Sequence, residues 1–151
     1  MAQVRTDPFP AFNFEVLIQG ITDDGSPAKA GFAEVSGLEI DVAVIEYRTG
    51  GEDITVRKLP GLRKYTNIVL KRGYTNDLSL WNWMKSVLDG QAVRADGSIV
   101  LLDEARQPVM RWKFRRGFPC KLVGPTLNAK GNEVAIETLE IAHEGLTIEG
   151  A

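Results

Sequence analysis

Residues 64–84 read KYTNIVLKRGYTNDLSLWNWM, a patterned segment that passes through a glycine into a pair of tryptophans. From Tyr65 to Lys71 the side chains alternate between two faces, with Thr66, Ile68 and Leu70 on one of them. A period of two is typical of a β-strand. The segment therefore predicts a strand. Its basic end leaves three interpretations open: the edge of an active site, a nucleic-acid platform or one wall of a subunit contact.

The tryptophans lie in the one helix that the sequence predicts, over residues 77–89. Asn76 or Asp77 can cap its start, apolar residues recur at helical spacing, and Gly90 is typical of a helix end. Trp81 lies to one side of the inner apolar stripe. Trp81 therefore lies either at the rim of the core or at an interface. The second interpretation is considered because partly exposed Trp is enriched at interfaces.

The rest of the chain reads as short strands separated by Gly- and Pro-containing turns. Strands are expected over 12–18, 38–47, 54–59, 98–102, 109–118, 120–123 and 133–141. The last of these is expected to switch face near Thr138. Many short strands with a single helix are typical of a β-sandwich or a partly open barrel.

The segment 38–59 predicts a long hairpin. Apolar residues occupy one face up to Val44 and the other face from Ile45, so we expect either a bulge near Val44 or burial of both faces. The tip is expected over 48–53, and the return strand is expected to end before Pro60. Apolar residues on both faces need cover that a chain of 151 residues does not readily supply, which indicates a subunit contact.

Composition and charge exclude several classes of protein. The chain is 44% hydrophobic and 25% charged with a net charge of −2, so it is predicted to fold and has no global field that attracts phosphates or anionic lipid. We expect one domain over 1–151, with residues 1–10 as an extended N-terminal arm. No transmembrane helix or signal peptide is predicted, and the single cysteine favours synthesis in a reducing cytoplasm.

No arrangement typical of an enzyme emerges, so we expect no catalysis, no cofactor and no metal. His143 is the only histidine and shows no metal-ligand spacing. The sequence RTGGED at 48–53 lacks the Lys and Ser/Thr of a phosphate loop. Cys120 is more simply a small hydrophobe than a nucleophile.

Binding of single-stranded nucleic acid is a stronger alternative than catalysis, since Arg111, Lys113 and Arg115 alternate with Trp112 and Phe114. The alternation argues against it, because the aromatic residues then face the core while the cations face away from it. This basic face is more simply a partner for acidic strands, such as those with Glu133 and Glu137.

Taken together, four segments resemble the tail tube proteins of contractile phage tails and of phage-tail-like extracellular injection systems. They are AFNFEVLIQG (11–20), GFAEVSGLEIDVAVIEYRTGG (31–51), VRKLPGLRKYTNIVLKRGYTNDLSLWNWM (56–84) and the segment from GSIVLLDE (97–104) to AIETLEIAHEGL (135–146). The resemblance spans about Phe9 to Leu146. It is the ordered set of these segments that is specific, since no single motif decides the family.

The resemblance implies a mainly β fold of two packed antiparallel sheets, with one flanking helix (77–89) and an extended hairpin loop (47–62). This fold is close to that of Hcp, the secreted ring-forming protein of type VI secretion. It implies that hexameric rings stack into a hollow inner tube, which a contracting sheath drives through a target envelope, with cargo possible in the lumen. Implied partners are other copies, the sheath protein, the baseplate or spike, and tube-terminating proteins. The particle is assembled in the cytoplasm and is either released or tethered to a membrane.

The resemblance also assigns candidate interface residues, with the hairpin at the ring-to-ring contact. Candidates for stacking and inter-subunit contact are Tyr47, Arg48, Gly50, Gly51, Glu52, Asp53, Arg57, Lys58, Arg63, Lys71 and Arg72. Trp81 is the candidate for an outer, sheath-facing surface. Arg72→Glu is expected to hinder assembly while leaving the fold intact. The alternatives are a tube-initiating baseplate paralogue and, more distantly, a nucleic-acid-binding β-barrel.

Overall fold

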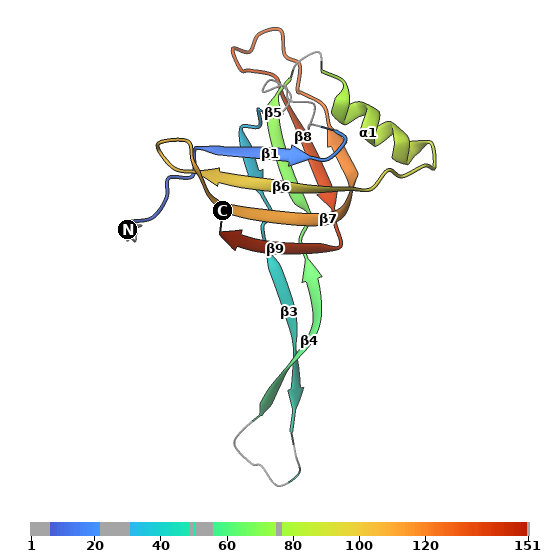
Figure 1. The fold of residues 1–151 in the computed structure, drawn as a ribbon. Coiled ribbons are helices and arrows are strands. Elements are labelled where there is room, and N and C mark those ends of the chain that lie inside the picture. Colours follow the sequence, from blue (N-terminus) through green and yellow to red (C-terminus); the bar gives the residue numbers. More distant parts are fainter. Residues whose placement is uncertain (1–6, 22–30, 49, 51–55, 75–76, 151) are drawn as a thin grey trace.

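The computed structural model describes residues 7–21, 31–48, 50, 56–74 and 77–150 (Figure 1). Within them the fold is mainly β, with one helix. The elements are β1 (Phe14–Ile18), β2 (Glu34–Ser36), β3 (Ile40–Tyr47), β4 (Arg57–Tyr65), β5 (Ile68–Gly73), α1 (Ser79–Leu88), β6 (Ala95–Leu102), β7 (Pro108–Val123), β8 (Ile136–Ala142) and β9 (Gly145–Gly150).

Seven strands form one antiparallel sheet in the order β1-β6-β7-β8-β5-β2, with β9 also paired to β7. The 16-residue β7 belongs to two layers, because its first half pairs with β6 and β9 and its second half with β8. In Figure 1 the layer of β1, β6, β7 and β9 crosses in front of β5 and β8. The prediction of two packed antiparallel sheets is thus confirmed, with β7 continuous between them.

The bend in β7 falls at Arg116 and Gly117. Arg116 has a φ of 50°, in the left-handed region, and the pairing with β6 is irregular at this point. A Cβ on Gly117 would lie 2.8 Å from the ring of Phe114 and 2.9 Å from Ile141, so only glycine fits where the layers close on each other. The sequence predicted two strands here, 109–118 and 120–123, because Gly and Pro resemble turn residues.

The core lies between the two layers and is closed on one side by α1. Its largest fully buried side chains include Ile18, Ile68, Leu139, Ile141 and Trp83. Trp83 reaches the core from α1, and its indole N–H donates to the Val93 carbonyl at 2.7 Å. The pattern of inner helix residues is therefore confirmed. The helix is preceded by Asp77, which accepts the Ser79 N–H at 3.0 Å, and is followed by Gly90 with a φ of 81°.

Two strands near the C-terminus differ from the prediction. Glu137, Leu139 and Ile141 are all buried on one face of β8, so the strand does not switch face near Thr138. Strand β9 was not predicted, because GLTIEG is short and glycine-rich. It forms the outer edge of its layer, and it is antiparallel to β7 from Arg115 to Met110.

The β3–β4 hairpin is a separate two-stranded sheet that projects from the body (Figure 1). Its pairing shifts between Val42 and Val44, which confirms the predicted bulge. The return strand runs through Pro60 to Tyr65 rather than ending before Pro60. Proline is tolerated there because it lies next to the bulge in a ribbon of only two strands. The paired hairpin is accordingly longer than the predicted 47–62.

Candidate assembly interface

The hairpin presents apolar side chains on both of its faces. Successive residues of a strand point to opposite sides, and directly paired residues share a side. The register therefore defines face I by Ile40, Val42, Val44, Pro60 and Tyr65, and face II by Ala43, Ile45, Tyr47 and Leu59. Of these, Tyr65 packs against the core at the base, with its ring centroid 5.8 Å from that of His143.

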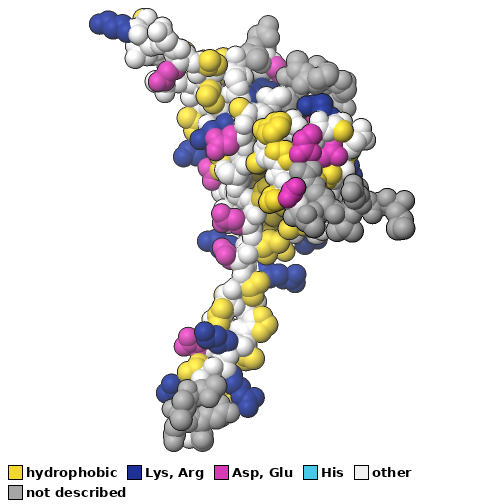
Figure 2. Space-filling view, turned by 90° about the vertical axis from the view of Figure 1, so that its left-hand side faces the viewer, with side chains coloured by type: hydrophobic (Ala, Val, Ile, Leu, Met, Phe, Trp, Pro, Cys, Tyr) yellow, Lys and Arg dark blue, Asp and Glu magenta, His cyan; other side chains and the backbone are white. Residues whose placement is uncertain are grey.

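Further along the hairpin the apolar side chains are uncovered. Ile40, Val42, Val44, Ile45, Tyr47 and Leu59 are each 45–61% exposed. Figure 2 shows hydrophobic side chains along the projecting hairpin, interspersed with Lys and Arg. A contiguous exposed apolar patch marks an interaction surface in a soluble protein. The hairpin is therefore the strongest candidate interface in the described part of the chain.

The hairpin is also basic, whereas the body is acidic. Residues 40–65 carry five cations and four carboxylates, a net charge of +1; they are Arg48, Arg57, Lys58, Arg63, Lys64, Asp41, Glu46, Glu52 and Asp53. The remaining residues of the chain carry 13 cations and 16 carboxylates, a net charge of −3. Such opposite charge favours association of the hairpin with the body of another copy.

Most of the predicted interface residues lie on this hairpin. Tyr47 is paired with Arg57, Lys58 with Glu46 and Arg63 with Val42. These residues, together with Arg48 and Gly50, are exposed. Gly51, Glu52 and Asp53 lie outside the described residues. The candidate interface residues did not include the exposed apolar residues of the hairpin other than Tyr47, although the sequence showed apolar residues on both faces of the segment.

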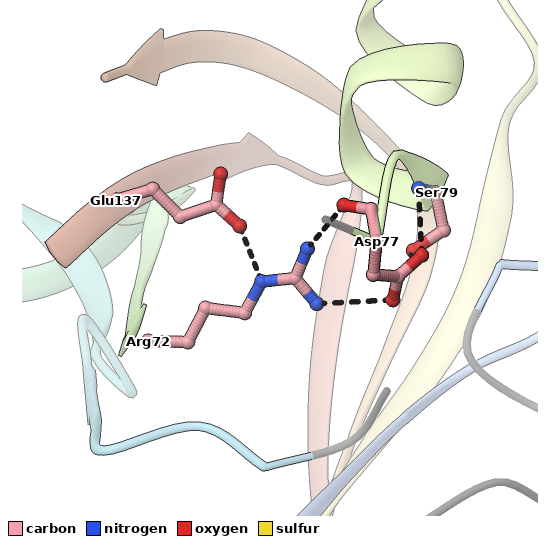
Figure 3. A network of polar contacts seen from close by, with 4 residues as sticks. All are labelled: Arg72, Asp77, Ser79 and Glu137. Carbon is pink, nitrogen blue, oxygen red and sulfur yellow. Dashed lines mark hydrogen bonds and ion pairs between the residues drawn. The ribbon is translucent and has the colours of Figure 1, made fainter. Parts of the chain in front are cut away.

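Arg72 corrects the prediction that placed it at a subunit contact. Its side chain is only 3% exposed and donates to Glu137 through Nε and to the Asp77 carbonyl at 3.2 Å (Figure 3). Nη1 also lies 3.4 Å from the Asp77 carboxylate. The guanidinium thus joins β5, β8 and the start of α1 inside one subunit. Arg72→Glu would therefore place three carboxylates together and disrupt the fold, contrary to our expectation.

Lys71, the neighbouring residue, points to the other side of β5. Its Nζ lies 3.6 Å from the Glu34 carboxylate on β2, and both side chains are largely exposed. The two adjacent basic residues therefore have different environments. The exposed Lys71 side chain can therefore contact a partner subunit, whereas the buried Arg72 side chain cannot.

The layer that contains β1, β6, β7 and β9 has two outer edges, formed by β1 and β9. Backbone hydrogen bonds join Gln19 N to Asp96 O and Leu102 N to Asn13 O. The main-chain N–H and C=O groups of the odd-numbered residues of β1 therefore point toward β6. The main-chain groups of Phe14 and Val16 therefore point outward, and no described strand pairs with them or with the outer side of β9. Unpaired edges of this kind are templates for strand addition.

Ile148 on β9 shows that the β9 edge is incomplete. It lies in the same row as Trp112, Ile99 and Val16, which face the core. Ile99 and Val16 are buried, whereas Ile148 is 54% exposed because none of the described strands lies beyond it. The opposite face of the strand carries Glu149, which binds Lys113 at 2.8 Å. The sequence predicted that the basic strand face contacts strands with Glu133 and Glu137. In the structure, Lys113 on that face binds Glu149 on β9 instead.

The hydrogen bond from Lys113 lowers the pKa of the Glu149 carboxyl below its usual value, with a smaller contribution from Arg111. A lowered pKa in the folded state adds stability above the unfolded pKa, and this contribution is lost as the pH falls through the folded value. Lys113→Met should therefore raise the pKa of Glu149, measured by NMR titration of its side-chain carboxyl. Lys121→Met, further along β7, is the control and should leave it unchanged.

Trp81 lies on the outward side of α1. Leu78, Trp81 and Leu88 are 44–67% exposed, and with Lys85 they follow a spacing of three and four residues along one stripe. Leu80 and Trp83 on the opposite side are buried. This partly exposed position is compatible with both interpretations of Trp81, the rim of the core and an interface residue.

The residues considered for chemistry have structural roles. The ring nitrogens of His143 lie 2.9 Å from the Thr66 carbonyl and 3.1 Å from the Gly145 carbonyl, which joins β8 and β9 to the β4–β5 connection. Burial raises the pKa of the Cys120 thiol, which disfavours the reactive thiolate. The described residues contain no group of three or more His, Cys, Asp or Glu placed to hold a metal ion. No described helix is long and apolar enough to span a membrane.

Comparison with known families identifies the chain. The model of the T4-like virus tail tube protein gp19 family matches residues 10–147. The chain belongs to this family. No curated protein matches the chain significantly at the level of sequence. The predicted resemblance to tail tube proteins is thereby confirmed.

Solved structures agree with this family of tube proteins. A chain of the PVC extracellular contractile injection system, in its sheath-tube complex in the extended state, is 27% identical, with a TM-score of 0.82 over 95% of this chain and 93% of that one. A chain of the anti-feeding prophage cap, the tube terminating cap, is 28% identical with a TM-score of 0.84, covering 100% and 97%. Hcp1 from Flavobacterium johnsoniae, 17% identical with a TM-score of 0.60 over 91% and 95%, shares the fold.

Proposed function

We propose that this protein is the inner-tube subunit of a contractile injection particle or phage tail. Membership of the tail tube family carries the proposal. The incomplete β1 and β9 edges and the uncovered hairpin support it, because these surfaces need other copies of the chain to cover them. The role is structural and non-enzymatic.

Hexameric rings form when the β9 edge of one copy receives the β1 edge of the next. β1 and β7 run in the same direction and β9 runs opposite to both, so β9 and the incoming β1 are antiparallel. Repeating this heterologous contact around an axis closes a ring and leaves no free edge in the layer. Rings then stack into a hollow tube through the basic hairpin.

The partners follow from the same function. The exposed stripe of Trp81 on α1 contacts the sheath, and the ends of the tube meet baseplate and terminator proteins. The particle is assembled in the cytoplasm, and its lumen accommodates cargo. The comparisons include a chain of the anti-feeding prophage baseplate, but they do not support the alternative of a tube-initiating baseplate paralogue better than the main tube.

Electron microscopy of the purified full chain, together with sedimentation, tests the proposal. Rings and stacked tubes are expected, and a monomer that persists at high concentration would contradict the function. Ile148→Asp should abolish rings while the monomer stays folded, because a carboxylate then occupies the uncovered core-facing position at the seam. Thr147→Asp is the matched control: its side chain points to the opposite face of β9, and it should still form rings.

A further inference from the structure

We propose that the two faces of the β3–β4 hairpin are covered by two different copies of this chain. Face I contacts the neighbour within the same ring, and face II contacts a copy in the adjoining ring. The inference rests on the proposed function and specifies the contacts of that tube subunit. Each hairpin is then a junction of three copies.

A ribbon of two strands is a single layer, so one flat partner surface can cover only one of its sides. Both sides carry apolar residues that are about half exposed: Val42 and Val44 on face I, and Ile45 and Leu59 on face II. A hairpin that served only one contact would be polar on its other face, as half-buried strands are. Two apolar faces therefore require two covering surfaces.

The direction of the hairpin assigns face I. Figure 1 shows that the hairpin extends beyond β9, on the side where a further strand would join the layer. The β1 edge of the next copy in the ring occupies that place. At its base, face I already packs against the subunit's own core through Tyr65, which is paired with Ile40. Face I continues this core-facing side beyond β9, and it therefore meets the neighbour in the ring.

Face II points away from that neighbour and is left for the adjoining ring. Tyr47 lies on it near the end of the hairpin, paired with Arg57. Residues 40–65, which form the hairpin, carry a net charge of +1 and the rest of the chain −3, so a second copy of this chain is a partner of opposite charge. A copy of the chain is thus the common occupant of both faces.

Photo-crosslinking at two adjacent positions tests the assignment. The photoreactive residue p-benzoylphenylalanine replaces either Val44 on face I or Ile45 on face II, and crosslinked peptides are identified by mass spectrometry in single rings and in tubes, separated by sedimentation. Position 44 should crosslink copies in single rings and in tubes. Position 45 should crosslink copies only in tubes, and to a different peptide. Crosslinks from position 45 in single rings, or one shared target peptide for both positions, would overturn the inference.

Paired polar variants give a second measurement that does not depend on the crosslinker. The double variant Val42→Thr and Val44→Thr changes face I. The double variant Ile45→Thr and Leu59→Thr changes face II. Because all four side chains are exposed, both variants should leave the monomer folded. The face I pair should lower the yield of rings at least about tenfold, and the face II pair should spare rings and lower tube mass about tenfold. Equal loss of rings in both pairs contradicts the inference. A wild-type chain that forms neither rings nor tubes would instead reject the proposed function.

Discussion

Arg72→Met should lower the free energy of unfolding by about 3–5 kcal/mol. The substitution removes the cation that lies between Glu137 and Asp77 and leaves a buried carboxylate without its partner. The measurement is urea-induced unfolding of the monomer, followed by tryptophan fluorescence. Loss of tubes should follow as a consequence of unfolding rather than of a missing contact.

Lys71→Met is the matched control, because it removes a neighbouring cation from the same strand. Its partner Glu34 is exposed, so the cost should be below about 1 kcal/mol. A second control combines Arg72→Met with Glu137→Leu and should recover part of the lost stability, since no carboxylate then remains unpaired on β8. Equal effects of Arg72→Met and Lys71→Met would contradict the role assigned to the buried guanidinium.

Removal of the hairpin should abolish tubes without unfolding the body. The variant replaces residues 41–64 by an Asn-Gly turn and keeps the paired Ile40 and Tyr65, because Tyr65 contributes to the core. We expect tube mass to fall more than about 100-fold, since two apolar contacts per copy are lost together. Electron microscopy and sedimentation measure tubes, and thermal unfolding measures the body.

The unfolding temperature of the hairpin variant should stay within about 5 °C of the parent. This control separates a missing interface from a damaged fold. Tubes of normal length from a folded hairpin variant would show that stacking uses another surface. Unfolding of the body would show that the hairpin stabilises the subunit itself.

The sequence-based prediction succeeded where alternation and hydrophobicity coincide. Ile68 and Leu70 were assigned to one face of a strand and are buried, and the bulge near Val44 follows from the change of apolar face. Arg72 and Glu137 continue the buried faces of their strands. They were nevertheless assigned to polar surroundings, because a charged residue is rarely buried unless it is paired. Their pairing joins positions 65 residues apart, which a pattern of local spacing does not contain.

Other features depend on tertiary context in the same way. The bend at Arg116 and Gly117 resembles a turn between two strands, although hydrogen bonds to β6, β9 and β8 hold both halves as one strand. Strand β9 has weak intrinsic preference and forms because β7 offers it an edge. The family was recognisable from the order of several segments, whereas the exposure of Ile148 required the structure.

The continuity of β7 has a mechanical consequence for a tube that transmits thrust along its axis. Two separate sheets joined only by side-chain packing could slide over each other under load. Here a single 16-residue strand runs through both. Sliding would have to break backbone hydrogen bonds cooperatively along it, so the wall of the tube resists buckling through its covalent chain as well as through its packing.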